Sequence, residues 1–179
     1  MKGWYLGECI VIGRNAKGMN DISVISDIFT EEERNLFIKN IQPLLVSGEK
    51  FGYSDRSYPG KQTHPTLHLH LDFVDIHKIL LIRIKEDVGL NLKIYKSWVN
   101  WTNGKVKEHW HNHPCSWTGV YYMKTFPFLN NGTLFESKFI RVPQNSLLLF
   151  PGDLMHTAPK FPFGLDRYTW AMEFEYHGQ

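Results

Sequence analysis

The sequence has little cysteine, with only Cys9 and Cys115 among its 179 residues. Two cysteines so far apart do not make the dense disulfide framework of a small secreted domain, so we expect both thiols to be reduced. The sequence also lacks any apolar run of the roughly 18 residues that a membrane-spanning helix needs. Its first residues contain no apolar signal core. These absences predict a cytoplasmic protein that does not enter a membrane.

An excess of charge of one sign is missing too. The chain has 20 basic and 18 acidic residues, a net charge of +2, and its lysines and arginines form no stripe. Binding to nucleic acid or to an anionic membrane needs concentrated positive charge, so we expect neither partner. The sequence contains no repeat, no low-complexity segment and no linker. Its length suits one domain with a sizeable core, and we expect residues 1–179 to form a single domain.

The first half of the chain carries two helical patterns. Thr30 with Glu33 three positions later predicts a capping box. The apolar spacing that follows predicts a helix from about residue 31 to 41, ended by Pro43. A second helix is predicted from about residue 73 to 88, with Gly89 at its end. Short edge strands are predicted within residues 1–28, and a loop over residues 46–66.

The second half changes to short strands separated by turn residues. We predict strands near residues 92–100, 107–113, 117–125, 133–140, 145–151 and 167–176, and Asn103-Gly104 indicates a hairpin turn. Strands at this spacing, in a chain with 15% aromatic residues, are typical of a barrel or jelly roll. The predicted fold is mainly β: a double-stranded β-helix (jelly roll, cupin-like) over residues 91–177, with helical and edge support from residues 1–90.

Three histidines in the second half can close around one metal ion. Side chains two apart on a strand share a face, so His111 and His113 both point into the predicted barrel. His156 follows 43 residues later, after a buried strand and a turn. A third ligand from a strand across the barrel would complete a facial arrangement. His109 has the same parity, but Pro114 puts the other pair nearer the barrel mouth, and we favour His111 and His113.

The alternative is that these are ordinary surface or core histidines. A single pair two residues apart is weak evidence, and the chain has a second one, His68 and His70, which precedes a helix and has no evident third partner. We interpret that pair as structural. His64, His77 and His177 are interpreted as incidental.

Arg167 and Thr169 lie two apart at the start of the last predicted strand. The planar guanidinium can hold a carboxylate through two hydrogen bonds, and the hydroxyl can donate another. A structural arginine, paired with Asp166, Asp153 or Glu173, is the alternative. Strands flanking the site carry further candidates for contact with a ligand. Asn100 is a polar residue on an otherwise apolar strand, and we predict that it hydrogen-bonds a ligand. We also predict that Tyr121 contacts the ligand, although most aromatic residues at such positions belong to the core.

These segments together resemble the 2-oxoglutarate/Fe(II)-dependent oxygenase family. The resemblance covers about residues 92–176 and is carried by four stretches: His111-Asn112-His113-Pro114, Thr118-Gly119-Val120-Tyr121-Tyr122, Leu149 to His156, and Arg167-Tyr168-Thr169. It is greatest to a His-x-His-Pro branch found in marine bacteria and their phages. The resemblance implies that His111, His113 and His156 bind Fe(II), and that Arg167 with Thr169 binds the far carboxylate of 2-oxoglutarate.

One position departs from the wider superfamily, which has Asp or Glu where this chain has His113. Three neutral imidazoles leave a ferrous ion one charge unit more positive than two histidines and a carboxylate do. Asp153 and Glu108 are the acids nearest in sequence from which a carboxylate ligand could come instead.

The sequence therefore predicts an Fe(II)- and 2-oxoglutarate-dependent dioxygenase that hydroxylates a small-molecule or peptidyl substrate. A prolyl or other peptidyl side chain is suggested by analogy with prolyl hydroxylases. Two alternatives stand beside it. One is a three-histidine, cupin-type dioxygenase that does not use 2-oxoglutarate, and the other is a non-catalytic β-barrel that holds a metal or small ligand.

Overall fold

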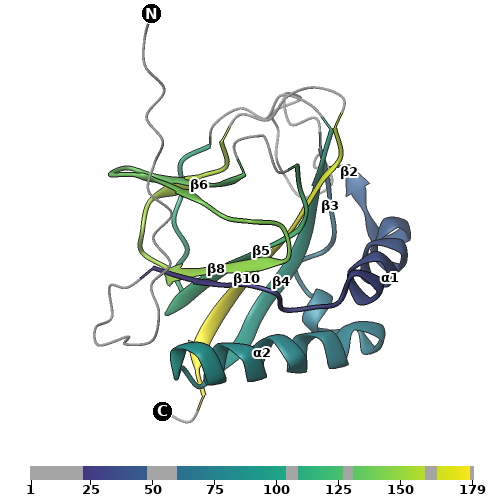
Figure 1. The fold of residues 1–179 in the computed structure, drawn as a ribbon, viewed down its shortest axis with the longest axis horizontal. Helices are drawn as coiled ribbons and strands as arrows, with labels where there is room; N and C mark the ends of the chain where they lie inside the picture. Colours follow the sequence, from purple (N-terminus) through teal and green to yellow (C-terminus); the bar gives the residue numbers. More distant parts are fainter. Residues whose placement is uncertain (1–21, 48–59, 104–108, 127–130, 160–164, 178–179) are drawn as a thin grey trace, which may run out of the picture.

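Two antiparallel sheets face each other in the computed structural model of the protein, which describes residues 22–47, 60–103, 109–126, 131–159 and 165–177 (Figure 1). The larger sheet has, in spatial order, β1 (Ser23–Ile25), β8 (Ser146–Pro151), β5 (Trp117–Lys124), β10 (Arg167–Tyr176), β4 (Leu92–Thr102), β3 (Gly60–Gln62) and β2 (Val46–Ser47). The smaller has β7 (Phe139–Arg141), β6 (Gly132–Phe135) and β9 (His156–Thr157). This is the predicted double-stranded β-helix.

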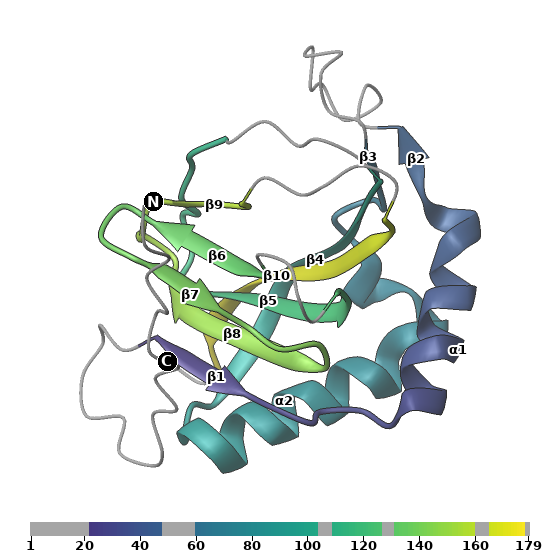
Figure 2. The same ribbon diagram turned by 45° about the horizontal axis from the view of Figure 1, so that its top comes forward.

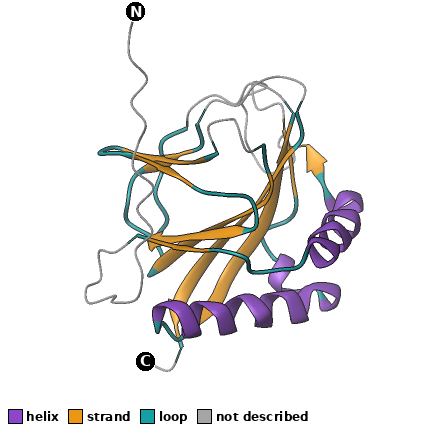
Figure 3. Ribbon diagram, viewed as in Figure 1, coloured by secondary structure: helices purple, strands orange, loops and turns teal. Residues whose placement is uncertain are grey.

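Two α-helices cover the face of the larger sheet that points away from the smaller one (Figures 2 and 3). Helix α1 (Glu31–Ile41) begins at the predicted capping box, in which Thr30 and Glu33 exchange hydrogen bonds. It ends where Pro43 enters the 3-10 helix η1 (Gln42–Leu44). Neither α1 nor α2, the two α-helices of the described residues, is long and apolar enough to cross a membrane.

Helix α2 (Val74–Val88) follows two short 3-10 helices, η3 (Leu67–Leu69) and η4 (Leu71–Phe73). It ends at Gly89, whose φ of 78° is left-handed and suits glycine. Its apolar side packs on the larger sheet through the buried residues His77, Leu80 and Ile84. The sequence therefore predicted both α-helices close to their observed bounds.

The pairing of β10 with its neighbours decides which residues face the helices and which face the smaller sheet. Residues opposite each other in an antiparallel pair share a face. Trp170 pairs with Val99 and Tyr121, and all three lie in the core under the helices. Thr169 pairs with Asn100 and Tyr122. These residues therefore face the interior between the two sheets, where a site can be built.

Three predicted segments differ from the structure. The predicted loop over residues 46–66 contains β2 and β3, which pair at the edge of the larger sheet. The predicted strand over 133–140 is two strands, β6 and β7, separated by a tight turn. Residues 109–113 form no regular strand, and only His111 makes an isolated bridge, to His156. Gly104 and residues 107–108 lie outside the described residues, as does Cys9.

The structure corrects the interpretation of His77 as incidental, because its ring joins α2 to the sheet. Its Nδ1 donates to the carbonyl of Phe73 at 2.6 Å, and its Nε2 accepts from the Ser97 hydroxyl at 3.0 Å. Ser97 in turn accepts from Nε1 of Trp170 at 2.6 Å. A neutral ring satisfies every group in this chain. Burial lowers the pKa of His77 to about 4, because the charged ring would lose its hydration; His68 lowers the pKa further, while the hydrogen bond to Phe73 opposes the shift.

Acid should therefore destabilise the protein through His77. The folded-state pKa of about 4 lies below the ordinary value of 6.5, so the unfolded chain binds more protons between these pH values. Stability is present above pH 6.5 and is lost as the pH falls toward 4. We expect a loss of about 2 kcal/mol from this residue between pH 7 and pH 5.

Urea unfolding of His77→Gln across that range is the measurement. Because His156 titrates in the same direction, the variant should flatten the pH dependence without removing it. His70→Gln, at an exposed position, is the control and should keep the wild-type dependence. If the free energy of unfolding of His77→Gln depends on pH as strongly as that of wild type, the acid sensitivity does not come from His77.

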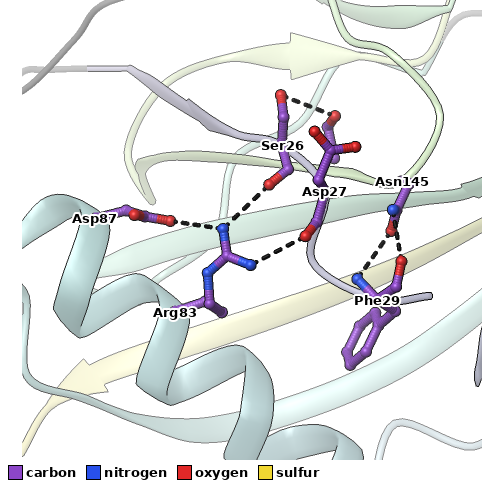
Figure 4. A network of polar contacts seen from close by, with 7 residues as sticks. Ser26, Asp27, Phe29, Arg83, Asp87 and Asn145 are labelled. Atoms are coloured by element: carbon purple, nitrogen blue, oxygen red, sulfur yellow. Dashed lines mark hydrogen bonds and ion pairs between the residues drawn. The ribbon is translucent and has the colours of Figure 1, made fainter.

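A second polar connection holds the segment between β1 and α1 against the sheet (Figure 4). Asn145 accepts from the backbone N–H of Phe29 at 3.1 Å and from the Tyr121 hydroxyl at 2.7 Å. Its Nδ2 donates to the Phe29 carbonyl at 2.7 Å. From the other side, Arg83 on α2 donates to the carbonyls of Ser26 and Asp27. These contacts fix a segment that regular secondary structure does not hold.

Asn145→Ala should lower the free energy of unfolding by about 3 kcal/mol or more. The change leaves the Phe29 backbone groups and the Tyr121 hydroxyl without their partners, at about 1 to 3 kcal/mol for each buried group. Asn145 also has φ of 64°, where alanine is strained. Chemical denaturation of Asn145→Ala and Asn145→Gly separates the two causes, since glycine loses the same hydrogen bonds as alanine but is not strained at this φ. Equal stability of Asn145→Gly and wild type would show that the hydrogen bonds contribute nothing.

Candidate metal centre and ligand site

His111, His113 and His156 lie together at one end of the space between the two sheets. One ring nitrogen from each lies within 4.8 Å of the others. Their ring centroids are 5.0 Å apart for His111 and His113, 4.4 Å for His111 and His156, and 5.3 Å for His113 and His156. His156 is buried and the other two are partly exposed. Nitrogens at this spacing can bind one ion on a single face.

The backbone brings these residues together in a way that strand parity did not predict. His111 and His156 exchange both backbone hydrogen bonds, at 3.0 and 2.9 Å, so the third histidine is a direct neighbour and does not come from across the barrel. His113 donates from its backbone to Gly152 at 2.8 Å. A Cβ at Gly152 would lie 2.2 Å from the Cys115 carbonyl oxygen. Glycine there allows the two histidine-bearing segments to pack closely.

Among the described residues, the hydrogen bonds of the three rings all use Nδ1, and Nε2 is left without a partner on each. Nδ1 of His111 lies 2.8 Å from the His109 carbonyl, and Nδ1 of His156 lies 2.8 Å from the Leu154 carbonyl. Nδ1 of His113 lies 3.0 Å from Oε1 of Glu173. Each of these oxygens accepts a hydrogen bond from Nδ1–H, so the proton of the neutral ring lies on Nδ1 and Nε2 keeps its lone pair. Metal-binding histidines are held in this manner.

Burial favours the neutral form of two of these rings, His111 and His156. Burial lowers the pKa of His156 to about 4, and the neighbouring histidines lower it further while the bond to Leu154 opposes the shift. Burial also lowers the pKa of His111. Phe150 and Phe135 pack on His156 with centroids at 4.8 and 6.1 Å, which keeps water from that side of the group. Neutral imidazoles at pH 7 are the form that binds metal.

A buried carboxylate stands directly behind the group. Glu173 on β10 is 4% exposed, and its two oxygens contact His113 and Lys96. Burial raises the pKa of Glu173, but the hydrogen bonds from His113 and Lys96 outweigh it and hold the pKa below its ordinary value. Sequence reasoning named Glu173 only as a partner for Arg167. The signal that could have found it was a charged residue on an otherwise apolar strand.

The other acids considered for the centre do not join it. Asp153 is exposed and is not part of the group, and Glu108 lies outside the described residues. The ring of His109 stacks on His111 at 5.4 Å, also outside the group. Within the described part of the chain no Asp or Glu joins the three histidines. The group is therefore all-histidine, and the carboxylate of Glu173 is separated from it by the ring of His113.

Arg167 lies at the opposite end of the inner face of β10 from Glu173. It is 5% exposed, and its guanidinium lies 5.6 Å from the centre of the Tyr122 ring. Thr169 lies next along the same face, and Thr102 is the pairing partner of Arg167 on β4. Asp166, a possible structural partner in the sequence interpretation, instead accepts from Trp101 and Asn103. A charged donor and two hydroxyls thus face the interior together.

The inner face also includes Asn100 but not Tyr121. Asn100 pairs with Thr169, so the two side chains share the interior. Tyr121 instead lies in the core under the helices, where its hydroxyl binds Asn145. The structure does not bring Tyr121 to the site, because strand alternation points its neighbour Tyr122 there. Burial raises the pKa of Tyr122, which Arg167 and a 2.7 Å hydrogen bond with Thr133 only partly oppose.

No family model matches the sequence, and no curated protein matches it. Solved structures do. The structural neighbours include proteins solved with 2-oxoglutarate bound, prolyl hydroxylases and an epimerase. HygX from Streptomyces hygroscopicus, solved with nickel and 2-oxoglutarate bound, superposes with a TM-score of 0.66 at 12% identity, covering 87% of this chain and 83% of that one. HygX has also been solved with iron bound.

Two further structural neighbours are enzymes that are named for different reactions. The viral collagen prolyl hydroxylase of Paramecium Bursaria Chlorella virus-1 has a TM-score of 0.62 at 12% identity, and the match covers 99% of each chain. The non-heme α-ketoglutarate-dependent epimerase SnoN from nogalamycin biosynthesis has a TM-score of 0.67 at 9% identity, covering 87% of this chain and 76% of that one. At such identities the likeness establishes the fold.

The residues on this fold suit both a metal ion and a dicarboxylate. Three imidazole Nε2 atoms form a ligand set that suits Fe(II). For the dicarboxylate, the deciding observation is Thr102. Its hydroxyl is buried beside Arg167 and has no hydrogen-bond partner among the described residues. Buried hydroxyls are normally bonded, so a ligand oxygen at Arg167 would complete the bonding there.

Proposed function

We propose that the protein is an Fe(II)- and 2-oxoglutarate-dependent dioxygenase that hydroxylates a second, organic substrate. The observation that carries the proposal is the presence of two features in the space between the sheets. Three histidines, from the 109–113 segment and β9, converge with Nδ1 hydrogen-bonded and Nε2 left for a metal. Arg167 and Thr169 on β10, with Thr102 on β4, face the same interior. A centre that binds a metal and a 2-oxo acid together needs both features.

The roles of the residues follow from their contacts. His111, His113 and His156 would hold Fe(II) through Nε2. Arg167 would hold the far carboxylate of 2-oxoglutarate bidentately, with Thr102 and Thr169 as further donors. When bound, Fe(II) and 2-oxoglutarate supply the oxidation, in which O2 converts the 2-oxo acid to succinate and CO2 and one oxygen atom enters a C–H bond of the substrate.

The wall around the centre supports this chemistry. Phe135 and Phe150 cover His156, so water is excluded from the inner side of the metal site. His111 and His113 are partly exposed, so the substrate would approach from the side that they line. Tyr122 would carry the aliphatic part of the 2-oxo acid beside Arg167.

Anaerobic addition of Fe(II) and then 2-oxoglutarate tests the proposal. A weak metal-to-ligand charge-transfer band in the visible, followed by succinate formation on admission of O2, is the expected result. Iron binding without the band would favour a three-histidine, cupin-type dioxygenase that does not use the 2-oxo acid. That alternative is favoured by one observation, the absence of Asp or Glu from the described metal group. Failure to bind iron would leave a non-catalytic binding protein.

A peptidyl side chain is the substrate class that we propose first. The neighbours include prolyl hydroxylases of viral and of Pseudomonas putida origin, while HygX was solved with the small molecule hygromycin B. Succinate release should rise when a proline-rich peptide is added. Equal release with and without peptide, but a rise with an aminoglycoside, would assign a small-molecule substrate instead.

A further inference from the structure

The three histidines differ in what stands behind them. His111 and His156 donate from Nδ1 to neutral backbone carbonyls, whereas His113 donates to the carboxylate of Glu173 at 3.0 Å. Glu173 is 4% exposed and lies on strand β10, which pairs with β4 on one side and β5 on the other. The chain thus places a buried negative charge one imidazole ring away from the proposed metal.

The position of Glu173 matters because residue 113 is a histidine and not a carboxylate. A carboxylate ligand would bring a negative charge into direct contact with the metal, and a neutral imidazole does not. A carboxylate that accepts the Nδ1 proton draws it away from the ring, which raises the electron density on Nε2 and makes the ring a stronger ligand. His113 is the histidine that receives this effect.

We propose that Glu173 supplies, through His113, the negative charge that the all-histidine centre lacks, and that Lys96 limits how much of it reaches the metal. Glu173 is then a positioning residue, because it acts through His113. The inference rests on the proposed metal centre and deepens it.

The role of Lys96 allows the inference to be tested by the direction in which metal affinity changes. Its Nζ lies 3.1 Å from Oε2 of Glu173, and its side chain is 40% exposed. The ammonium group attracts the carboxylate charge and so competes with the Nδ1 proton of His113. Removing Lys96 should strengthen the pull of Glu173 on that proton. Glu173→Gln and Lys96→Met should therefore change metal binding in opposite directions.

A purely structural pair predicts a different pattern. If Glu173 only held the ring of His113 in place, and Lys96 only held Glu173, then loss of either residue would loosen the site and weaken metal binding. The glutamine substitution is chosen because its Oε1 can still accept from Nδ1 of His113, so the ring stays oriented while the charge is lost. Lys96→Arg keeps the positive charge and is the matched control.

Mn(II) is the probe, with dissociation constants measured by titration calorimetry on the full chain at one fixed pH. Glu173→Gln should weaken Mn(II) binding about 10-fold or more, within the range known for groups that support metal ligands. Lys96→Met should tighten it, and Lys96→Arg should match wild type. The Fe(III)/Fe(II) midpoint potential is the second readout. It should rise in Glu173→Gln and fall in Lys96→Met, because negative charge favours Fe(III).

The outcomes separate this inference from the function on which it rests. Tight Mn(II) binding by wild type with an unchanged constant in Glu173→Gln would overturn the charge role and leave the metal centre standing. Weaker binding in both Glu173→Gln and Lys96→Met would assign a structural role to the pair. No Mn(II) binding by wild type would overturn the metal centre itself, and the inference with it.

Discussion

Alanine at His111, His113 or His156 should each abolish tight metal binding, with a loss of Fe(II) or Mn(II) affinity of more than about 100-fold. The reason is that each change removes one of three ligand nitrogens, and loss of a group that merely supports a ligand already costs about 10- to 100-fold. Succinate formation should fall with the metal. Titration calorimetry with Mn(II), and anaerobic titration with Fe(II), measure the effect.

His109→Ala is the matched control, since His109 lies two residues from His111 but its ring is outside the group. Its variant should bind metal like wild type. His68→Ala, on η3 beneath α2, is a distant control with the same expected result. Loss of binding in His109→Ala together with retention in His113→Ala would show that the wrong pair of histidines had been assigned.

Arg167→Ala should remove most of the affinity for 2-oxoglutarate while leaving metal binding intact. Loss of one partner of a buried, charge-assisted pair costs on the order of 2–5 kcal/mol, because the other charge is left without its counterpart. This corresponds to about 30-fold or more in the dissociation constant. The charge-transfer band of the Fe(II) protein, titrated with 2-oxoglutarate under nitrogen, measures it.

Related variants show how the clamp works. Thr169→Ala removes one neutral donor and should cost about 1 kcal/mol. Arg167→Lys keeps the charge but loses the planar pair of N–H groups, so its affinity should lie between alanine and wild type. Arg141→Ala, at an exposed position on β7, is the control and should change nothing. An unchanged 2-oxoglutarate constant in Arg167→Ala would rule out the clamp.

Local signals in the sequence were enough for the helices and for most of the strands. The capping box at Thr30 and Glu33 and the left-handed glycine at Gly89 act within one turn, so they can be found without knowledge of the rest of the fold. Strand β8 is marked by a buried, continuous apolar run, and strands β5 and β10 by their aromatic and other apolar residues. The short strands β2 and β3 were missed, because two or three residues at a sheet edge have no periodicity of their own.

The sequence also indicated the candidate residues for the proposed chemistry, since two histidines two positions apart, a third after a turn, and an arginine–threonine pair can be recognised from residue type and spacing. Tertiary structure decided the rest. The bridge between His111 and His156, and the contact of His113 with Gly152, join segments about 40 residues apart. Strand register placed Tyr122 in the interior and Tyr121 in the core, a choice that a shift of one residue would reverse. The carboxylate of Glu173 stands behind His113 only because β10 passes under that loop, 60 residues farther along the chain.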